Sequence, residues 1–177
     1  MKLIHYVFIC LIVMAISGGY AMYAPETTPN ILGHPDGIAE MTVGGNGVER
    51  FIPIQWAVFV FQCASLAVGP FLMALGVREE RRTTLFKLLM AGSTVCVLAS
   101  WAALFFSYKQ FLDTGETGYF FGFPVPTAWM IYGTWISALS FISVFGLGFR
   151  VFVLPKEDED AFTAYAAELR AKEQGGA

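Results

Sequence analysis

The stretch FFGFPVPTAWMIYGTW, residues 120–135, leads into the last long apolar segment of the chain. Aromatic rings stand on both sides of Pro124 and Pro126, and no residue of the stretch is charged. Pro126 suits the first turn of a helix, because its φ is already helical and the amide hydrogen it lacks has no partner there. The stretch therefore predicts a rigid, ring-lined elbow that opens into a membrane-spanning helix.

The composition of the whole chain indicates an integral membrane protein. Of 177 residues, 56% are hydrophobic and 14% are charged, whereas about 25% are charged in an ordinary soluble domain. The charges occur in blocks between long apolar runs, as expected when apolar side chains face lipid and charges stay in water. The net charge of −3, without an extended basic patch, excludes a nucleic-acid partner.

Four apolar runs predict an all-α fold with four transmembrane helices. The predicted spans are residues 3–23, 53–77, 88–107 and 127–154. Each is long enough to cross a hydrocarbon core of about 30 Å at 1.5 Å per residue. Residues 1–154 are predicted to form one transmembrane domain, and residues 155–177 a cytoplasmic tail. The first run also fits a signal peptide cleaved near Ala21 or Ala24, but its apolar part is longer than such peptides usually have.

The distribution of Lys and Arg predicts the orientation. The N-terminus, the loop between the second and third spans, the inner end of the fourth span and the tail hold nine basic residues, and the two outer segments hold only Arg50 and Lys109. Segments rich in Lys and Arg stay in the cytoplasm. The N- and C-termini are therefore predicted to be cytoplasmic, and the elbow to lie on the outer face of a bacterial cytoplasmic (inner) membrane, in a multi-pass protein.

The two extramembrane segments carry further local signals. In the outer loop, residues 25–51, alternating apolar residues at 38–43 and 48–52 flank a glycine-rich turn and predict a small β-hairpin. His34 and Asp36 in this loop form an incomplete metal-ligand set. In the tail, apolar residues at i, i+3, i+4 and i+7 from Phe162 predict an amphipathic helix over 157–173, with a frayed tail as the alternative.

Small residues recur at helical spacing in the third and fourth spans. Gly92, Cys96 and Ser100 are four residues apart, as are Gly133 and Ser137. Such faces allow another helix to approach closely. Gln62 lies near the middle of the second span, where an amide usually makes a hydrogen bond to another helix. A role for Gln62 in the passage of a substrate is the alternative.

No catalytic constellation is present in the sequence. Apart from Arg150 near the inner end of the fourth span, the spans contain no Asp, Glu, Lys or Arg, although transporters usually need such groups at depth. His5 and His34 fall on opposite sides of the membrane, which excludes a paired-histidine haem site. Cys10, Cys63 and Cys96 form no CxxC motif. We therefore predict no catalytic, cofactor-binding or metal-binding residue, and the chain favours a protein that is not an enzyme.

Aromatic residues gather in the predicted outer half of the chain. An interfacial belt accounts for part of this excess, and a surface that binds a protein or a quinone is the alternative. The residues predicted to contact a partner are Phe120, Phe121, Phe123, Pro124, Trp129, Tyr132, Gly133, Trp135, Ser137, Gly92 and Ser100.

Residues 119–156 resemble the small accessory subunits of bacterial sodium:solute symporters. The resemblance rests on the turn Phe120–Pro124, Tyr132 early in the following helix, and Arg150 before an acidic tail. Those subunits usually have two spans, and the resemblance does not extend to residues 1–117 of this chain. The resemblance implies a non-catalytic accessory or assembly subunit whose partners are the lipid bilayer and a larger integral membrane protein.

Two other functions remain open from the sequence. The chain is alternatively a membrane anchor subunit of a quinone-linked oxidoreductase, with the outer rings stacked on a quinone headgroup. In a third interpretation, the outer loop 25–51 senses a ligand.

Overall fold

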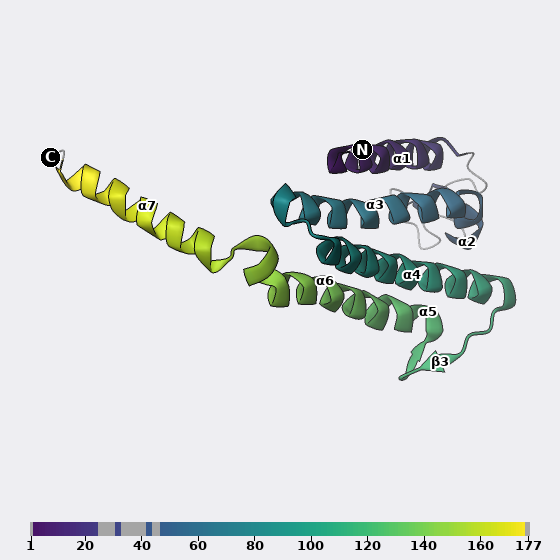
Figure 1. Ribbon diagram of the computed structural model, residues 1–177. Coiled ribbons are helices and arrows are strands. Elements are labelled where there is room, and N and C mark those ends of the chain that lie inside the picture. The colour runs from purple at the N-terminus through teal and green to yellow at the C-terminus, as the bar shows by residue number, and fades with distance from the viewer. Residues whose placement is uncertain (1, 25–30, 33–41, 44–46, 176–177) are drawn as a thin grey trace.

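Four long helices dominate the computed structural model, which describes residues 2–24, 31–32, 42–43 and 47–175 (Figure 1). They are α1 (Leu3–Tyr23), α3 (Gln55–Leu75), α4 (Thr84–Thr114) and a composite helix of α5 (Val125–Ala128), the π-helical turn η3 (Trp129–Gly133), α6 (Thr134–Gly148) and the π-helical turn η4 (Phe149–Val153). Each is long and apolar enough to cross a membrane. The predicted all-helical, four-span fold is confirmed.

The four helices form an open row rather than a closed bundle. Each packs chiefly on its neighbour in the chain, α1 on α3, α3 on α4, and α4 on α5, η3 and α6. Figure 1 shows them side by side in this order. We call the end of the row that carries Arg78, Arg81, Arg82 and Arg150 the arginine end, and the opposite end, with Trp56 and Tyr108, the aromatic end.

Local signals set the two ends of α4. The Thr83 side chain accepts a hydrogen bond from the Phe86 amide at 3.3 Å and caps the first turn. Gly115, at φ 71°, takes the left-handed conformation that commonly ends a helix. The helix is longer than the predicted span, and residues 108–114, expected in a polar link, are helical. A helix continues beyond the membrane when it contains no breaker, and Gly115 is the first one here.

The outer loop contains a small antiparallel strand pair, as predicted, but one of its two strands is not the predicted one. Strand β2 (Thr42–Val43) pairs antiparallel with β1 (Ile31–Leu32). The predicted second strand at 48–52 is wrong, because Gly47–Phe51 form the helix α2 and Ile52–Ile54 the 3₁₀-helix η1. Pro53 in the first turn favours helix over strand, and these turns join α3 as one helical segment from Val48 to Leu75. His34 and Asp36 lie outside the described residues.

A cluster of buried side chains fastens α3, α4 and η4 together at the arginine end. Its members are Ala74, Val77, Phe86, Met90, Val144 and Phe152. Phe86 is only 1% exposed, and its ring lies 5.2 Å from that of Phe152 and 6.2 Å from that of Phe145, centroid to centroid. Arg82 donates to the Val77 and Leu75 carbonyls at 2.9 and 3.3 Å, which satisfies the C-terminal end of α3.

The predicted tail helix is confirmed as α7 (Lys156–Gly175), which extends away from the arginine end of the row (Figure 1). Ion pairs hold its first turn. Asp158 accepts from Arg81 at 2.8 Å and from Arg78 at 3.4 Å, and Glu159 pairs with Arg150. The apolar stripe of Phe162, Tyr165 and Leu169 is exposed.

Candidate functional site

The elbow begins with a two-residue β-hairpin. Strands β3 (Tyr119–Phe120) and β4 (Phe123–Pro124) pair antiparallel, with Phe120 opposite Phe123. Phe121 and Gly122 link them with φ of 47° and 81°. Positive φ at both central residues gives a type I′ turn, whose twist matches that of the strands. Glycine adopts this conformation readily, whereas phenylalanine there costs about 1–2 kcal/mol.

The ring of Tyr132 gathers the hairpin against the following helix. Phe120, Phe121 and Phe123 each meet it edge-on, with centroids 6.1, 5.8 and 6.3 Å away. The Val125 amide donates to the Gly118 carbonyl at 3.0 Å and closes the hairpin base. Four of the predicted contact residues are thus brought together, with Pro124 in β4 beside them. Phe121 remains 77% exposed at the tip.

The strain at Phe121 gives a test of the hairpin. Asparagine tolerates the left-handed conformation, so Phe121→Asn should leave the turn intact, whereas Gly122→Val should open it by about 1–2 kcal/mol. Hydrogen exchange of the Val125 amide, whose partner is the Gly118 carbonyl, reports opening directly. Faster exchange in Phe121→Asn than in Gly122→Val would contradict this geometry.

The close helix contact predicted from small residues is made within the chain. A Cβ atom added at Gly133 would lie 3.0 Å from Ser100 Cβ and 3.2 Å from Trp129 Cε3. Ser137, 2% exposed, donates to the Gly133 carbonyl at 2.7 Å, and its Oγ lies 3.2 Å from Ser100 Oγ and 3.8 Å from Cys96 Sγ. Gly133, Ser137 and Ser100 are therefore occupied by α4–α6 packing and do not present a free face to a separate helix.

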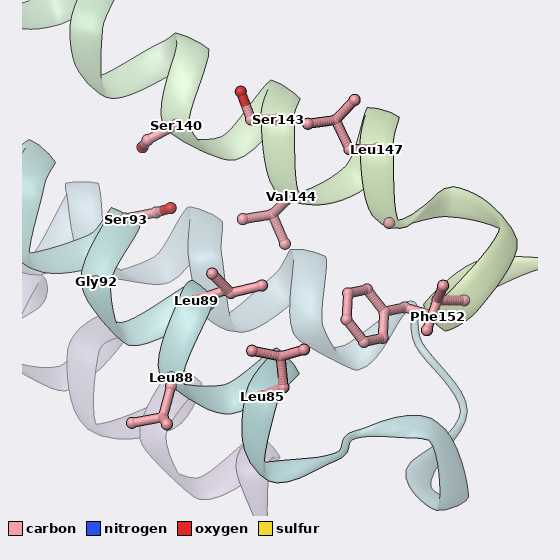
Figure 2. A pocket seen from close by; sticks show the side chains of 12 residues that line it. Leu85, Leu88, Leu89, Gly92, Ser93, Ser140, Ser143, Val144, Leu147 and Phe152 are labelled. Atoms are coloured by element: carbon pink, nitrogen blue, oxygen red, sulfur yellow. The ribbon is translucent and has the colours of Figure 1, made fainter.

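Gly92 instead lines an open groove between α4 and α6, on the arginine side of that contact. The groove has a volume of about 600 Å³. Figure 2 shows Leu85, Leu89 and Phe152 pointing into the space between the two helices. Small residues on both helices widen it, namely Gly92, Ser93, Ser140, Ser143 and Gly148. A Cβ atom added at Gly92 would meet nothing within 4 Å, so this position is free.

One buried polar side chain of the groove, that of Ser93, lacks a partner among the described residues. Ser93 is 5% exposed, and within the described part of the chain its hydroxyl makes no hydrogen bond. By contrast, Ser140 donates to the Ser137 carbonyl at 2.6 Å, and Thr94 to the Met90 carbonyl at 2.7 Å. In Figure 2 the Ser93 hydroxyl points into the space below α6. The spacing of small residues had indicated Gly92 but not Ser93, because only the packing shows which hydroxyls are satisfied.

Much of the aromatic excess lies between α3 and α4. Phe59 stacks on Trp101 at 6.3 Å and meets Phe105 at 4.6 Å, centroid to centroid. Trp56 contacts Phe105 at 5.5 Å, and Lys109 Nζ lies 5.0 Å from the centroid of the Trp56 ring. These rings join the two helices. Trp129 and Trp135, by contrast, are exposed.

A second, smaller cavity of about 260 Å³ lies nearer the aromatic end, between α3, α4 and the start of α6. Gln62 and Leu66 line it from α3, and Trp101 from α4. Trp129 and Thr134 line it from the composite helix. The side-chain amide of Gln62, near the middle of the second span, therefore faces a cavity and makes no hydrogen bond to another helix within the described residues.

No metal-binding cluster is found in the parts of the chain that the structure describes, where no group of three or more His, Cys, Asp or Glu side chains could hold an ion. The three cysteines are free and only partly buried. The α4–α6 groove and the smaller cavity between α3, α4 and α6 each hold at least one polar side chain that has no hydrogen-bond partner among the described residues. No family model matches the chain, and no curated protein or solved structure matches it either.

Proposed function

We propose that this protein is a non-catalytic accessory or assembly subunit, and that its α4–α6 groove receives a transmembrane helix of a larger membrane protein. The observation that carries this proposal is the buried, unpartnered hydroxyl of Ser93 in an open groove. A hydroxyl without a partner in apolar surroundings costs about 1–3 kcal/mol in proteins. An occupant that bonds to it removes that cost.

The groove has the dimensions of a helix contact. One turn of a helix about 10 Å across and 5.4 Å high fills roughly 400 Å³. The groove, at about 600 Å³, therefore accepts roughly one and a half turns. Its small residues at Gly92 and Ser143 allow a backbone to approach, which is how helices associate in lipid.

The depth of Ser93 argues against a phospholipid as the occupant. Ser93 is nine residues into α4, or roughly 14 Å from the arginine end. Half of a hydrocarbon core is only about 15 Å thick, so phospholipid headgroups do not reach this level. Acyl chains reach it but have no group that bonds to a hydroxyl. A helix with a small polar side chain meets both requirements.

The identity and placement of the partner rest on the sequence. A sodium:solute symporter is the first candidate, because residues 119–156 resemble the symporter accessory subunits. The nine-to-two distribution of basic residues supports an arginine end facing the bacterial cytoplasm.

Gly92→Leu tests the groove. The leucine would fill free space, so the fold should hold, while co-isolation of the partner should fall by about tenfold, equivalent to 1.4 kcal/mol. Ala91→Leu, on the same helix and also exposed, is the matched control. The measurement is recovery of a co-expressed symporter with the tagged chain in mild detergent, together with photocrosslinking from position 89.

Either of two results would contradict the proposal. One is a stable monomer that crosslinks to no protein from position 89. The other is an equal loss of partner in Ala91→Leu and Gly92→Leu, which would place the contact elsewhere.

A further inference from the structure

We infer that the smaller cavity, between α3, α4 and α6, binds the headgroup of a membrane-soluble quinone. This site lies toward the aromatic end, apart from the groove of the proposed function, and does not depend on it. It also differs from the predicted outer rings of the elbow, because its lining lies within the helix row. The hydrogen-bonding groups of the cavity, its depth and its size all favour this ligand.

Two polar side chains that line the cavity from different helices lack partners. Gln62 on α3 and Thr134 on α6 line it, and within the described residues neither side chain makes a hydrogen bond. Both can donate, the first through its amide and the second through its hydroxyl. An unbonded amide in an apolar region is costly. A ligand that accepts hydrogen bonds at two sites would satisfy both side chains.

The other polar groups of the cavity are already satisfied. Ser137 donates to the Gly133 carbonyl, so the Ser100 hydroxyl serves as donor in the 3.2 Å contact between the two. Trp101 Nε1 donates to the Phe59 carbonyl at 3.4 Å. What remains of the lining is mainly apolar, including the indole rings of Trp101 and Trp129. Two donors on separate helices and two indole rings match a planar ring that carries two carbonyl groups.

The depth excludes phospholipid headgroups here too. Gln62 follows Trp56 by six residues, or about 9 Å along α3. Thr134 is nine residues after the start of α5, or about 14 Å along the composite helix. Both donors thus face the hydrocarbon region. A polar ring at this depth must belong to a molecule that itself dissolves in the membrane.

The size of the cavity favours a quinone ring over a helix as its occupant. At about 260 Å³ the cavity is smaller than one helical turn, roughly 400 Å³. It is also slightly below the range of about 300–1,000 Å³ for whole-ligand pockets, as expected for a headgroup whose tail lies in the surrounding lipid. Trp129, Met130 and Thr134 are exposed at its rim, which leaves an opening for such a tail.

The test uses the full chain in nanodiscs, labelled with a photoreactive azido-ubiquinone and mapped by mass spectrometry. We expect labelling around Trp101 and Trp129 that excess decylubiquinone abolishes. Gln62→Leu should reduce this labelling about tenfold, the effect of losing roughly 1.4 kcal/mol, and Thr134→Val should also reduce it. Gln55→Leu, at the start of α3, is the matched control and should label like the unmodified chain.

Each outcome decides the matter. The inference is overturned if decylubiquinone does not compete with the labelling. It is also overturned if the Gln62→Leu variant has the same melting temperature as the unmodified chain and is labelled to the same extent. If Gln62→Leu leaves labelling unchanged but lowers co-isolation of a membrane protein, the amide faces a partner helix, and the quinone site is again refuted. Gly92→Leu should retain full labelling, so failure of the groove and failure of this site are distinguishable.

Discussion

Gly133→Leu is expected to destabilise the isolated chain by about 3 kcal/mol, the upper end of the roughly 1–3 kcal/mol that overpacking a tight contact typically costs. Even one added carbon at this position would come within 3.0 Å of Ser100 Cβ, and leucine adds three more. The helices α4 and α6 would have to separate, breaking the contact between Ser137 and Ser100. Thermal unfolding of the purified chain in detergent measures the effect.

Gly146→Leu provides the control on the same helix. A Cβ atom at Gly146 meets nothing within 4 Å, so its stability should match that of the unmodified chain. The sequence placed Gly133 among the residues that contact a partner, an interpretation in which Gly133→Leu would block assembly instead. If Gly133→Leu unfolded normally and lost only its partner, that earlier interpretation would hold and the packing described here would be wrong.

Phe86→Ala should be the second large effect. The side chain is 1% exposed and packs on Phe145 and Phe152, which lie near the end of the fourth span. Truncating a buried phenylalanine usually costs about 3–5 kcal/mol. Because the cluster joins α3, α4 and η4 at the arginine end, its loss should loosen the whole row rather than one helix.

Phe8→Ala is the control that distinguishes the effect of burial from the effect of removing any phenylalanine ring. Phe8 is an exposed phenylalanine of α1, so its truncation should leave the unfolding midpoint nearly unchanged. Denaturant or thermal titration of both variants gives the comparison. Equal midpoints for the two variants would show that the cluster does not hold the helices together.

The positions of the spans were predictable because a membrane imposes a strong local rule. Backbone groups in hydrocarbon must be bonded within their own segment, so an apolar run of about 20 residues becomes a helix whatever its neighbours are. The turn at Phe121–Gly122 and the helix-starting Pro126 are local signals of the same kind. The tail helix followed from its periodicity.

The strand predicted at residues 48–52 failed because alternation is a weak signal near a helix start. Val48, Arg50 and Ile52 alternate with other residues, but a strand is stable only when a partner strand completes its hydrogen bonds. Strand β2 pairs with Ile31–Leu32, so the segment takes helical bonds within itself instead. Pairing is a long-range choice that the local pattern does not contain.

The sequence by itself determined that this is a four-helix membrane protein, where its helices run, and which residues are small enough for close packing. Only the tertiary structure decided which faces those residues meet. It placed Gly133 against Ser100 within the chain, opened the groove at Gly92, and set Gln62 before a cavity. The physical reason is that lipid tails are as apolar as the side chains they touch, so hydrophobicity does not select one helix face over another. Shape and the satisfaction of a few hydroxyl and amide groups make that selection, and both arise only when the helices meet.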